Sequence, residues 1–328
     1  MITKDLLHTE ENPIPPDAYS TFIETSDGVQ LRTASWDSRQ EPPQGTVLIL
    51  QGRAEFIEKH FEVIRELQDR GFAVVAFDWR GQGGSQRLVG NPRKGHIRDF
   101  SAFHLDVEAI TSNILKPYMP PPYYGLAYSM GGAIALDMAS RQTLPVERLI
   151  AISPMLGINL IKKPALASFT ANLCCAFGLG KAFIPFGGST SISTRPFNRN
   201  RLSSDPTRYA RISDVANTLG EAAIGAPTIA WTKAAFRLMK KLNRIETLNR
   251  IIIPSLIIAG GNDTVCDPGM MERASTHMRN AASVFIPHAR HEIYLEQDSY
   301  REAFWAAFDA FIPGKLTSPQ EIQKASKA

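Results

Sequence analysis

The chain has 328 residues, of which 44% are hydrophobic and 21% are charged, an ordinary composition for a globular protein. Its net charge of +4 is too small to indicate nucleic-acid binding by itself. Cys174 and Cys175 are adjacent and Cys266 stands alone, so the cysteines predict neither a disulfide framework nor a zinc site, and they favour a reducing compartment. No apolar run reaches the roughly 20 residues that span a bilayer, and none in Met1 to Pro16 is typical of a signal peptide. We therefore expect a soluble cytoplasmic protein.

The first elements predict a sheet that begins with an antiparallel pair. Two stretches, 19–24 and 30–36, flank Asp27-Gly28, a pair that is typical of a hairpin turn. Further along, short and nearly continuous apolar runs predict parallel strands that are covered on both faces. These runs are Thr46 to Leu50, Ala73 to Phe77, Tyr123 to Tyr128, Leu149 to Ser153, Ser255 to Ala259 and Ala282 to Ile286.

Helical patterns lie between the predicted strands. Apolar side chains recur every three or four residues from Phe56 to Leu67, with Gly71 as a stop, and again from Phe100 to Ile114. Ser299 and Glu302 have the spacing of a capping box for a last helix, which would bury Phe304, Phe308 and Phe311. Strands that alternate with helices predict an α/β fold, with a mostly parallel sheet and helices on both faces.

The alternation breaks between residues 155 and 245, where no strand is expected. These roughly 90 residues are far more than the about 12 to 15 of a long structureless loop. We interpret them as a helical insertion, a lid over the carboxyl edge of the sheet, which splits the core into residues 18–154 and 246–313. The polar terminal segments, residues 1–17 and 314–328, are expected to be flexible.

The segment Leu126-Ala-Tyr-Ser-Met-Gly-Gly132 follows a predicted strand and precedes an apolar helical stretch, which is the context of a nucleophile elbow, G-x-S-x-G. Ser129 would project from a turn so sharp that small residues are needed two positions to either side. Ala127 stands where the pattern has Gly, and Gly131 stands on the other side. Ser129 is therefore the predicted nucleophile. The competing interpretation is a structural turn where a helix packs closely on the sheet.

A serine hydroxyl needs a base to remove its proton, and the base needs a carboxylate that orients it. In this kind of fold the chain order is Ser, acid, His. Asp263 follows the penultimate predicted strand and His291 follows the last one, so the predicted triad is Ser129, Asp263 and His291. Asp267 is an alternative acid that lies further from the strand end. His288 is an alternative base that follows its strand almost directly and has less reach.

The negative oxygen of a tetrahedral intermediate needs two backbone N–H donors. We predict that Met130, directly after the nucleophile, supplies one of them. Arg53, in the loop after the first central strand, would supply the other, and Gly52 would let the backbone approach the substrate closely. The competing interpretation of this loop is an ordinary turn between a strand and a helix.

Five stretches of this chain resemble the lysophospholipase and monoacylglycerol lipase branch of the α/β hydrolases, which is of the serine aminopeptidase S33 type. They are QGRAEFIEK from Gln51, FDWRGQGGS from Phe77, YSMGG from Tyr128, GNDTV from Gly261 and RHEIYLE from Arg290. The resemblance covers roughly residues 19–313 apart from the insertion. The family often has His-Gly in the first stretch and Gly-His-Ser at the elbow, where this chain has Gln51-Gly and Ala-Tyr-Ser. These departures bear on the substrate more than on the reaction type.

The resemblance implies an α/β-hydrolase fold and a serine carboxylic-ester hydrolase that cleaves monoacyl lipid esters through an acyl-serine, without a cofactor. Its partner would be a small acyl ester and not a nucleic acid. An aminopeptidase on the same fold is an alternative, and it would need an acid such as Glu221 to face the site. A non-catalytic binding protein is a second alternative, although all three triad positions are filled.

The segment from Arg195 to Arg211 holds five arginines and one acid, Asp205. One interpretation is a solvated surface. The other is a patch that meets anionic headgroups near the site entrance, which would bring the lid into transient contact with a membrane surface.

Overall fold

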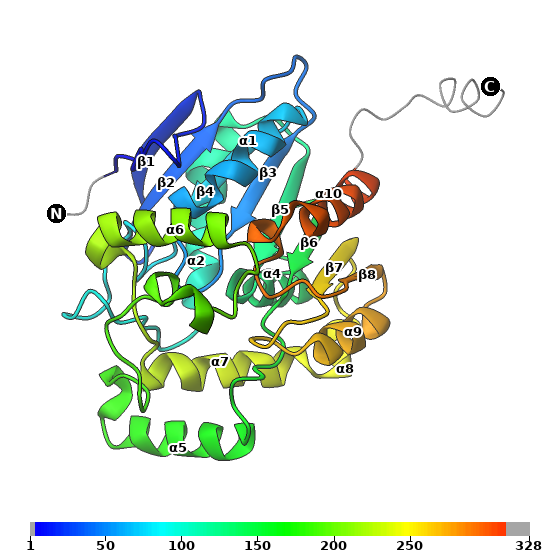
Figure 1. Cartoon of the computed structure of the whole chain (residues 1–328). Helices are drawn as coiled ribbons and strands as arrows, with labels where there is room; N and C mark the ends of the chain where they lie inside the picture. The colour runs from blue at the N-terminus through cyan, green and yellow to red at the C-terminus, as the bar shows by residue number, and fades with distance from the viewer. Residues whose placement is uncertain (1–3, 313–328) are drawn as a thin grey trace.

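The structure is a computed structural model that describes residues 4–312 (Figure 1). Its centre is an eight-stranded sheet in the order β1-β2-β4-β3-β5-β6-β7-β8. Strand β2 pairs antiparallel with β1 and with β4, and all other neighbours are parallel, which confirms the predicted hairpin and the mostly parallel sheet. The strands are β1 (Ala18–Glu24), β2 (Gln30–Trp36), β3 (Thr46–Leu50), β4 (Ala73–Phe77), β5 (Tyr123–Tyr128), β6 (Arg148–Ile152), β7 (Ser255–Gly260) and β8 (Ala281–Ile286).

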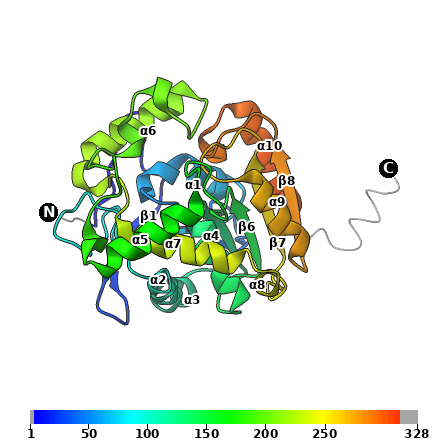
Figure 2. The same cartoon turned by 90° about the horizontal axis from the view of Figure 1, so that it is seen from below.

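The central strands are apolar throughout because both of their faces are covered. In β3 every residue is buried, with Val47 and Ile49 on one face and Leu48 and Leu50 on the other. The first face packs against α1 (Phe61–Asp69) and α10 (Asp298–Phe311). The second packs against α2 (Ala102–Ile110), α4 (Met130–Ser140) and α9 (Pro268–His277). Figure 2 shows these two groups of helices on opposite sides of the strands.

Two helix starts differ from the sequence pattern. The stretch from Phe56 begins as a 3₁₀ turn, Ile57–His60, and becomes α-helical only at Phe61; it stops as predicted at Gly71, whose φ is +85°. The predicted capping box of the last helix is wrong. Helix α10 begins at Asp298, one residue before Ser299, and no side chain caps it. Phe304 and Phe308 are buried as predicted, whereas Phe311 at the end of the helix is half-buried.

The chain between β6 and β7 forms helices and loops but no strand in the described residues. It contains α5 (Pro164–Ala176), α6 (Pro206–Leu219), α7 (Ile229–Leu242) and α8 (Ile245–Leu248), joined by short 3₁₀ turns. Trp231 of α7 packs on Phe100 of the core with ring centroids 5.6 Å apart, and Lys241 of α7 pairs with the buried Asp137 of α4. Helix α5 lies on the outer side of α7, farther from the sheet (Figure 1). We call residues 155–245 the inserted segment; its boundaries stay predictions.

The segment before β1 packs onto the core from Asp5 onward. Asn12 is buried and its Nδ2 donates to the carbonyl of Glu58 at 2.9 Å, while Leu7 N donates to the carboxylate of Glu58 at 3.2 Å. The predicted flexible tail, residues 314–328, lies outside the described residues. None of the helices within residues 4–312 is both long enough and apolar enough to cross a bilayer.

Candidate active site

The predicted nucleophile lies where the strand order of the sheet reverses. The chain leaves β3 to form β4 on one side and later returns as β5 on the other side. Side chains and loops that follow β3 and β5 therefore meet in one crevice at the carboxyl ends of these strands. Ser129 follows β5 directly, and the loop with Arg53 follows β3.

The turn at Ser129 is strained and tightly packed. Ser129 has φ +47° and ψ −109°, and it precedes helix α4. A Cβ on Gly131 would lie 2.1 Å from the carbonyl oxygen of Leu50, so only glycine fits between the elbow and β3. On the other side Ala127 is buried within β5, beside Leu50, and its methyl group is accommodated there. The elbow therefore leaves no unstrained room for a side chain at residue 131, whereas it accommodates a methyl group at residue 127.

The structure brings the three predicted triad residues together. His291 Nε2 lies 3.0 Å from Ser129 Oγ, and His291 Nδ1 lies 2.7 Å from Asp263 Oδ2. The other carboxylate oxygen of Asp263 accepts the backbone N–H groups of Val265 at 2.8 Å and Cys266 at 3.0 Å. Asp263 and His291 are buried and Ser129 is half-buried. This is the geometry in which a base can take the proton of a serine hydroxyl.

Neither alternative residue joins this arrangement. Asp267 caps helix α9, where its Oδ1 accepts the N–H of Gly269 at 2.9 Å. His288 is exposed and occupies the left-handed region with φ +65°. Each has a local structural role or an outward position, so the geometry favours Asp263 and His291.

The charges around His291 raise its pKa. Burial lowers the pKa of the imidazole, but the charge and hydrogen bond of Asp263 outweigh burial, and Glu292 and Glu55 add to the rise. The interactions that raise this pKa also stabilise the imidazolium that would form when the serine loses its proton. The same rise means that the neutral, basic form of His291 is lost at a higher pH than for an ordinary histidine.

Two side chains hold the predicted oxyanion loop: Gln82 from the loop after β4, and Glu55 from the loop itself. Gln82 brackets Arg53: its Nε2 donates to the carbonyl of Gly52 at 2.9 Å, and its Oε1 accepts the N–H of Ala54 at 3.2 Å. Glu55 Oε2 accepts the N–H of Gly52 at 2.5 Å. Within residues 4–312 the N–H groups of Arg53 and Met130 donate to no other group of the chain, so both are free to face a substrate.

A buried ionic cluster connects this loop to the histidine loop. Lys59 Nζ lies between Glu292 Oε1 at 2.5 Å and Glu55 Oε1 at 3.4 Å. Tyr294 donates its hydroxyl to Glu55, and its ring stacks on His60 with centroids 5.2 Å apart. Glu292 is the chain neighbour of His291, so this cluster couples the positions of the base and of the oxyanion loop.

Sequence reasoning did not assign functions to Gln82, Glu55, Lys59 and Glu292, although all four lie in the stretches that resemble the hydrolase branch. The sequence signal that could have found these four residues is the number of charged and polar side chains in stretches whose neighbouring motif positions must be buried. Cys266 was also missed as a site residue: it is buried, its backbone N–H donates to Asp263, and burial raises the pKa of its thiol well above the usual range. In the described part of the chain, no group of His, Cys, Asp and Glu side chains is placed to hold a metal ion.

Replacing Gly131 with alanine tests the packing constraint at the elbow. The added Cβ would lie 2.1 Å from Leu50 O, so β3 and α4 must move apart. We expect a loss of about 1–3 kcal/mol in the free energy of unfolding, measured by urea denaturation. Gly90→Ala is the matched control, because a Cβ there meets no atom within 4 Å. Equal stability of the two variants would show that the approach is not tight.

Replacing Glu292 with glutamine tests the electrostatic support of His291. The pKa of His291 is raised partly by Glu292, so we expect kcat/KM for a soluble ester to fall in acid with a pKa above that of an ordinary histidine. Removing the negative charge should shift this acid limb to lower pH. Glu302→Gln, which removes an exposed charge on α10, is the control and should leave the limb in place. An unchanged or upward-shifted limb in the Glu292 variant would contradict the assignment.

Known proteins share sequence with most of this chain. Residues 41–298 match the family described as serine aminopeptidase, S33. Lysophospholipase L2 of Escherichia coli K12 is 29% identical over 279 residues, which cover 81% of this chain and 79% of that protein. Human monoglyceride lipase is 26% identical over 249 residues, with coverage of 74% and 72%.

Solved structures show the same fold. A soluble variant of monoglyceride lipase from Saccharomyces cerevisiae superposes with a TM-score of 0.71 at 19% identity, over 90% of this chain and 95% of that one. A carboxyl esterase from Bacillus coagulans superposes with a TM-score of 0.73 at 20% identity, over 91% of this chain and all of that one, 100%. The chain thus has the α/β-hydrolase fold that its sequence predicted, and it belongs to the serine aminopeptidase S33 family.

Proposed function

We propose that this protein is a serine carboxylic-ester hydrolase that cleaves monoacyl lipid esters, with Ser129, His291 and Asp263 as its catalytic triad. The observation that carries the proposal is the continuous hydrogen-bonded chain from Ser129 Oγ through His291 to Asp263, at the carboxyl edge of the sheet. The substrate class is supported by the lysophospholipases and monoglyceride lipases among the relatives.

In the proposed reaction Ser129 Oγ attacks the ester carbonyl while His291 Nε2 takes its proton. The negative oxygen of the tetrahedral intermediate is bound by the N–H groups of Arg53 and Met130. His291 then gives the proton to the leaving alcohol, and the acyl group stays on Ser129. A water molecule, activated by the same imidazole, releases the fatty acid and restores the serine. Asp263 orients the imidazole throughout, and no cofactor takes part.

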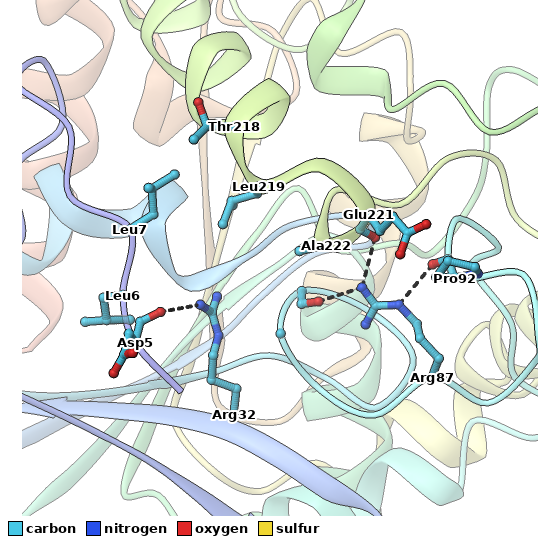
Figure 3. A pocket seen from close by; sticks show the side chains of 12 residues that line it. Asp5, Leu6, Leu7, Arg32, Arg87, Pro92, Thr218, Leu219, Glu221 and Ala222 are labelled. Atoms are coloured by element: carbon cyan, nitrogen blue, oxygen red, sulfur yellow. Dashed lines mark hydrogen bonds between the residues drawn. The ribbon is translucent and has the colours of Figure 1, made fainter. Parts of the chain in front are cut away.

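An aminopeptidase is the second candidate, because the family description carries that activity. Such an enzyme needs an acid beside the scissile bond to hold the substrate ammonium. Glu221, the acid considered for this role, is exposed and lines a separate cavity of about 680 Å³ with Arg32 and Arg87. None of the triad residues lines that cavity, where Arg87 donates to the carbonyls of Glu221 and Pro92 (Figure 3). This placement favours the esterase over the aminopeptidase.

Hydrolysis of p-nitrophenyl esters of rising chain length tests the proposal. We expect turnover by the wild type and a loss on the order of 10³-fold or more in Ser129→Ala, since that change removes the nucleophile. The chain-length optimum then measures the acyl site. Equal inactivity of both proteins on every ester would contradict ester hydrolysis, and peptide amides would be the next substrates to assay.

We propose that the inserted segment acts as a lid and that its helix α5 contacts a lipid surface. Helix α5 buries only Ala171 and exposes large apolar side chains along one face: Leu166 is 55% exposed, Phe169 65%, Leu173 48% and Phe177, just after the helix, 75%. Lys162 and Lys163 precede this face and are exposed. Exposed apolar side chains beside lysines are typical of helices that lie in the interface of an anionic bilayer.

Polar substitutions on α5 test this surface contact. We expect Phe169→Gln with Phe177→Gln to reduce co-sedimentation with anionic phospholipid vesicles severalfold, because two aromatic side chains no longer enter the interface. Tyr118→Gln removes an aromatic side chain that is 77% exposed on α3 (Lys116–Tyr118), and it is the control. Unchanged vesicle binding in the double variant would exclude α5 as the contact.

We also propose a cytoplasmic location. Cys174, Cys175 and Cys266 are free thiols in the structure, which supports a reducing compartment.

A further inference from the structure

The histidine loop, which follows β8, contacts two other parts of the chain. Glu292 Oε1 lies 2.5 Å from Lys59 Nζ in the buried ionic cluster. The same loop also contacts a short stretch of the inserted segment, residues 200–204, which lies just before α6 and which we call the clasp. Arg290 and Asn200 are 90 residues apart in the chain, so only the fold brings the clasp to this loop.

Two hydrogen bonds to backbone carbonyls join the clasp to the loop directly. Glu292 N donates to the carbonyl of Leu202 at 2.7 Å, and Ser203 donates its hydroxyl to the carbonyl of Leu295. Leu202 and Ser203 are buried, so water does not compete for these bonds. Glu292 N belongs to the planar peptide group that follows His291, and the position of Leu202 therefore fixes the backbone beside the imidazole.

The carboxylate of Glu296 ties the start of the loop to the same stretch. The side chain is fully buried, and its Oε1 accepts the N–H of Arg290, the residue before His291, at 2.8 Å. Its Oε2 accepts the N–H of Ser204 at 2.9 Å and the Ser204 hydroxyl, as well as the N–H of Gln297 at 3.2 Å. Hydrogen bonds to a buried carboxylate are charge-assisted and directional, so they hold the loop and the clasp in one arrangement.

The side chain of Arg290 makes a further contact with the clasp. Its Nη1 donates to the carbonyls of Ser203 at 2.9 Å and Asn200 at 3.2 Å. Asn200 closes the clasp into a turn, because its Oδ1 accepts the N–H of Leu202 and its Nδ2 donates to the carbonyl of Ser203, each at 2.6 Å. The carbonyl groups that the histidine loop binds are therefore held in place by the clasp itself.

Helix α6 anchors the clasp to the core. Arg208 Nη1 donates to the carbonyl of Glu296 at 3.0 Å, and its guanidinium pairs with Glu62 of α1. Arg211 pairs with the same carboxylate. Two arginines of residues 195–211 are thus structural. The other three are exposed: Arg195, Arg199 and Arg201.

We propose that the clasp positions His291 for catalysis, with Glu296 as the positioning residue that couples the inserted segment to this base. The inference rests on the proposed ester hydrolysis and adds residues 200–204 to the machinery of that reaction. The N–H groups of the residues on either side of the base, Arg290 and Glu292, are both bound by this arrangement.

The geometry of the triad explains why the backbone at this point matters. His291 must keep Nε2 3.0 Å from Ser129 Oγ while Nδ1 stays 2.7 Å from Asp263 Oδ2. Asp263 restrains the ring at one nitrogen, and the backbone of the loop decides where the other nitrogen lies. A displacement of about 1 Å at a reacting group can lower the rate on the order of 100-fold. The inserted segment therefore affects turnover even of a short, soluble ester that needs no lid.

Replacing Glu296 with glutamine tests the proposal with p-nitrophenyl butyrate as the substrate. The variant keeps the shape of the side chain, but one oxygen becomes an amide that cannot accept an N–H. We expect kcat to fall about tenfold and KM to change less than about twofold, because binding a short ester does not need the base. Glu302→Gln, an exposed position on α10, is the control and should keep the wild-type kcat. A wild-type kcat in Glu296→Gln would overturn the proposal.

Replacing Ser204 with alanine tests the same contact from the inserted segment. The change removes only the hydroxyl that Glu296 accepts, so it serves even where Glu296→Gln does not fold. We expect a severalfold lower kcat, whereas Ser299→Ala, an exposed serine on α10, should have no effect. In the double variant of Ser204 and Glu296 the loss should be smaller than the product of the two single losses, since both remove one contact. Independent losses would show that Glu296 acts without the inserted segment, which contradicts the coupling.

A spectroscopic measurement separates positioning from a purely structural role. The downfield proton resonance of His291 Nδ1–H reports the hydrogen bond to Asp263 in the folded protein without any substrate. We expect Glu296→Gln to shift or broaden this signal and Glu302→Gln to leave it in place. An unmoved resonance together with an unchanged kcat would leave Glu296 a structural role only.

The two proposals fail in different ways. If the wild type hydrolyses p-nitrophenyl butyrate and Glu296→Gln matches it, the clasp is wrong and ester hydrolysis stands. If the wild type leaves the ester intact, ester hydrolysis is wrong, and the resonance of His291 alone then decides whether the clasp positions this side chain.

Discussion

The site depends on a close approach of two chain segments at the centre of the sheet, the end of β3 and the first turn of α4. Gly131 lies so near the carbonyl oxygen of Leu50 that no Cβ fits between them. The same turn holds Ser129 at φ +47°, and the carbonyl oxygen of Gln51, where the loop after β3 starts, also lies close to Gly131. The strained backbone of Ser129 and the glycine at residue 131 are therefore two features of one packing constraint, at the place where we propose that the attacking atom and the oxyanion donors meet.

Beside this apolar contact the protein also buries a group of charged side chains. Glu55, Lys59 and Glu292 form a cluster that connects the oxyanion loop to the residue next to His291. Ion pairs of this kind contribute little net stability, because desolvation offsets much of their attraction. Their directionality fixes relative positions, however, and their net negative charge favours the imidazolium form of His291. The cluster therefore serves the chemistry more than the fold.

The inserted segment combines fixed and exposed parts. Helix α7 is held to the core by Lys241 and Asp137, and α6 is held by Arg208 and Glu62. Helix α5 lies outside α7 and presents apolar side chains to solvent. Ion pairs hold α6 and α7 to the core, whereas the outer helix α5 stays exposed, as the proposed contact with a lipid surface requires.

The sequence by itself determined the α/β fold and the three residues that the structure joins, because strand periodicity and the elbow are local patterns. Each of these residues follows a strand, and the carboxyl ends of parallel strands meet at one edge: Ser129, Asp263 and His291. Only the tertiary structure decided what supports them. Lys59 and Glu292 are 233 residues apart in the chain, and no local spacing pairs them. The arginines of residues 195–211 look alike in sequence, and only packing against α1 and α10 separates the structural ones from the exposed ones.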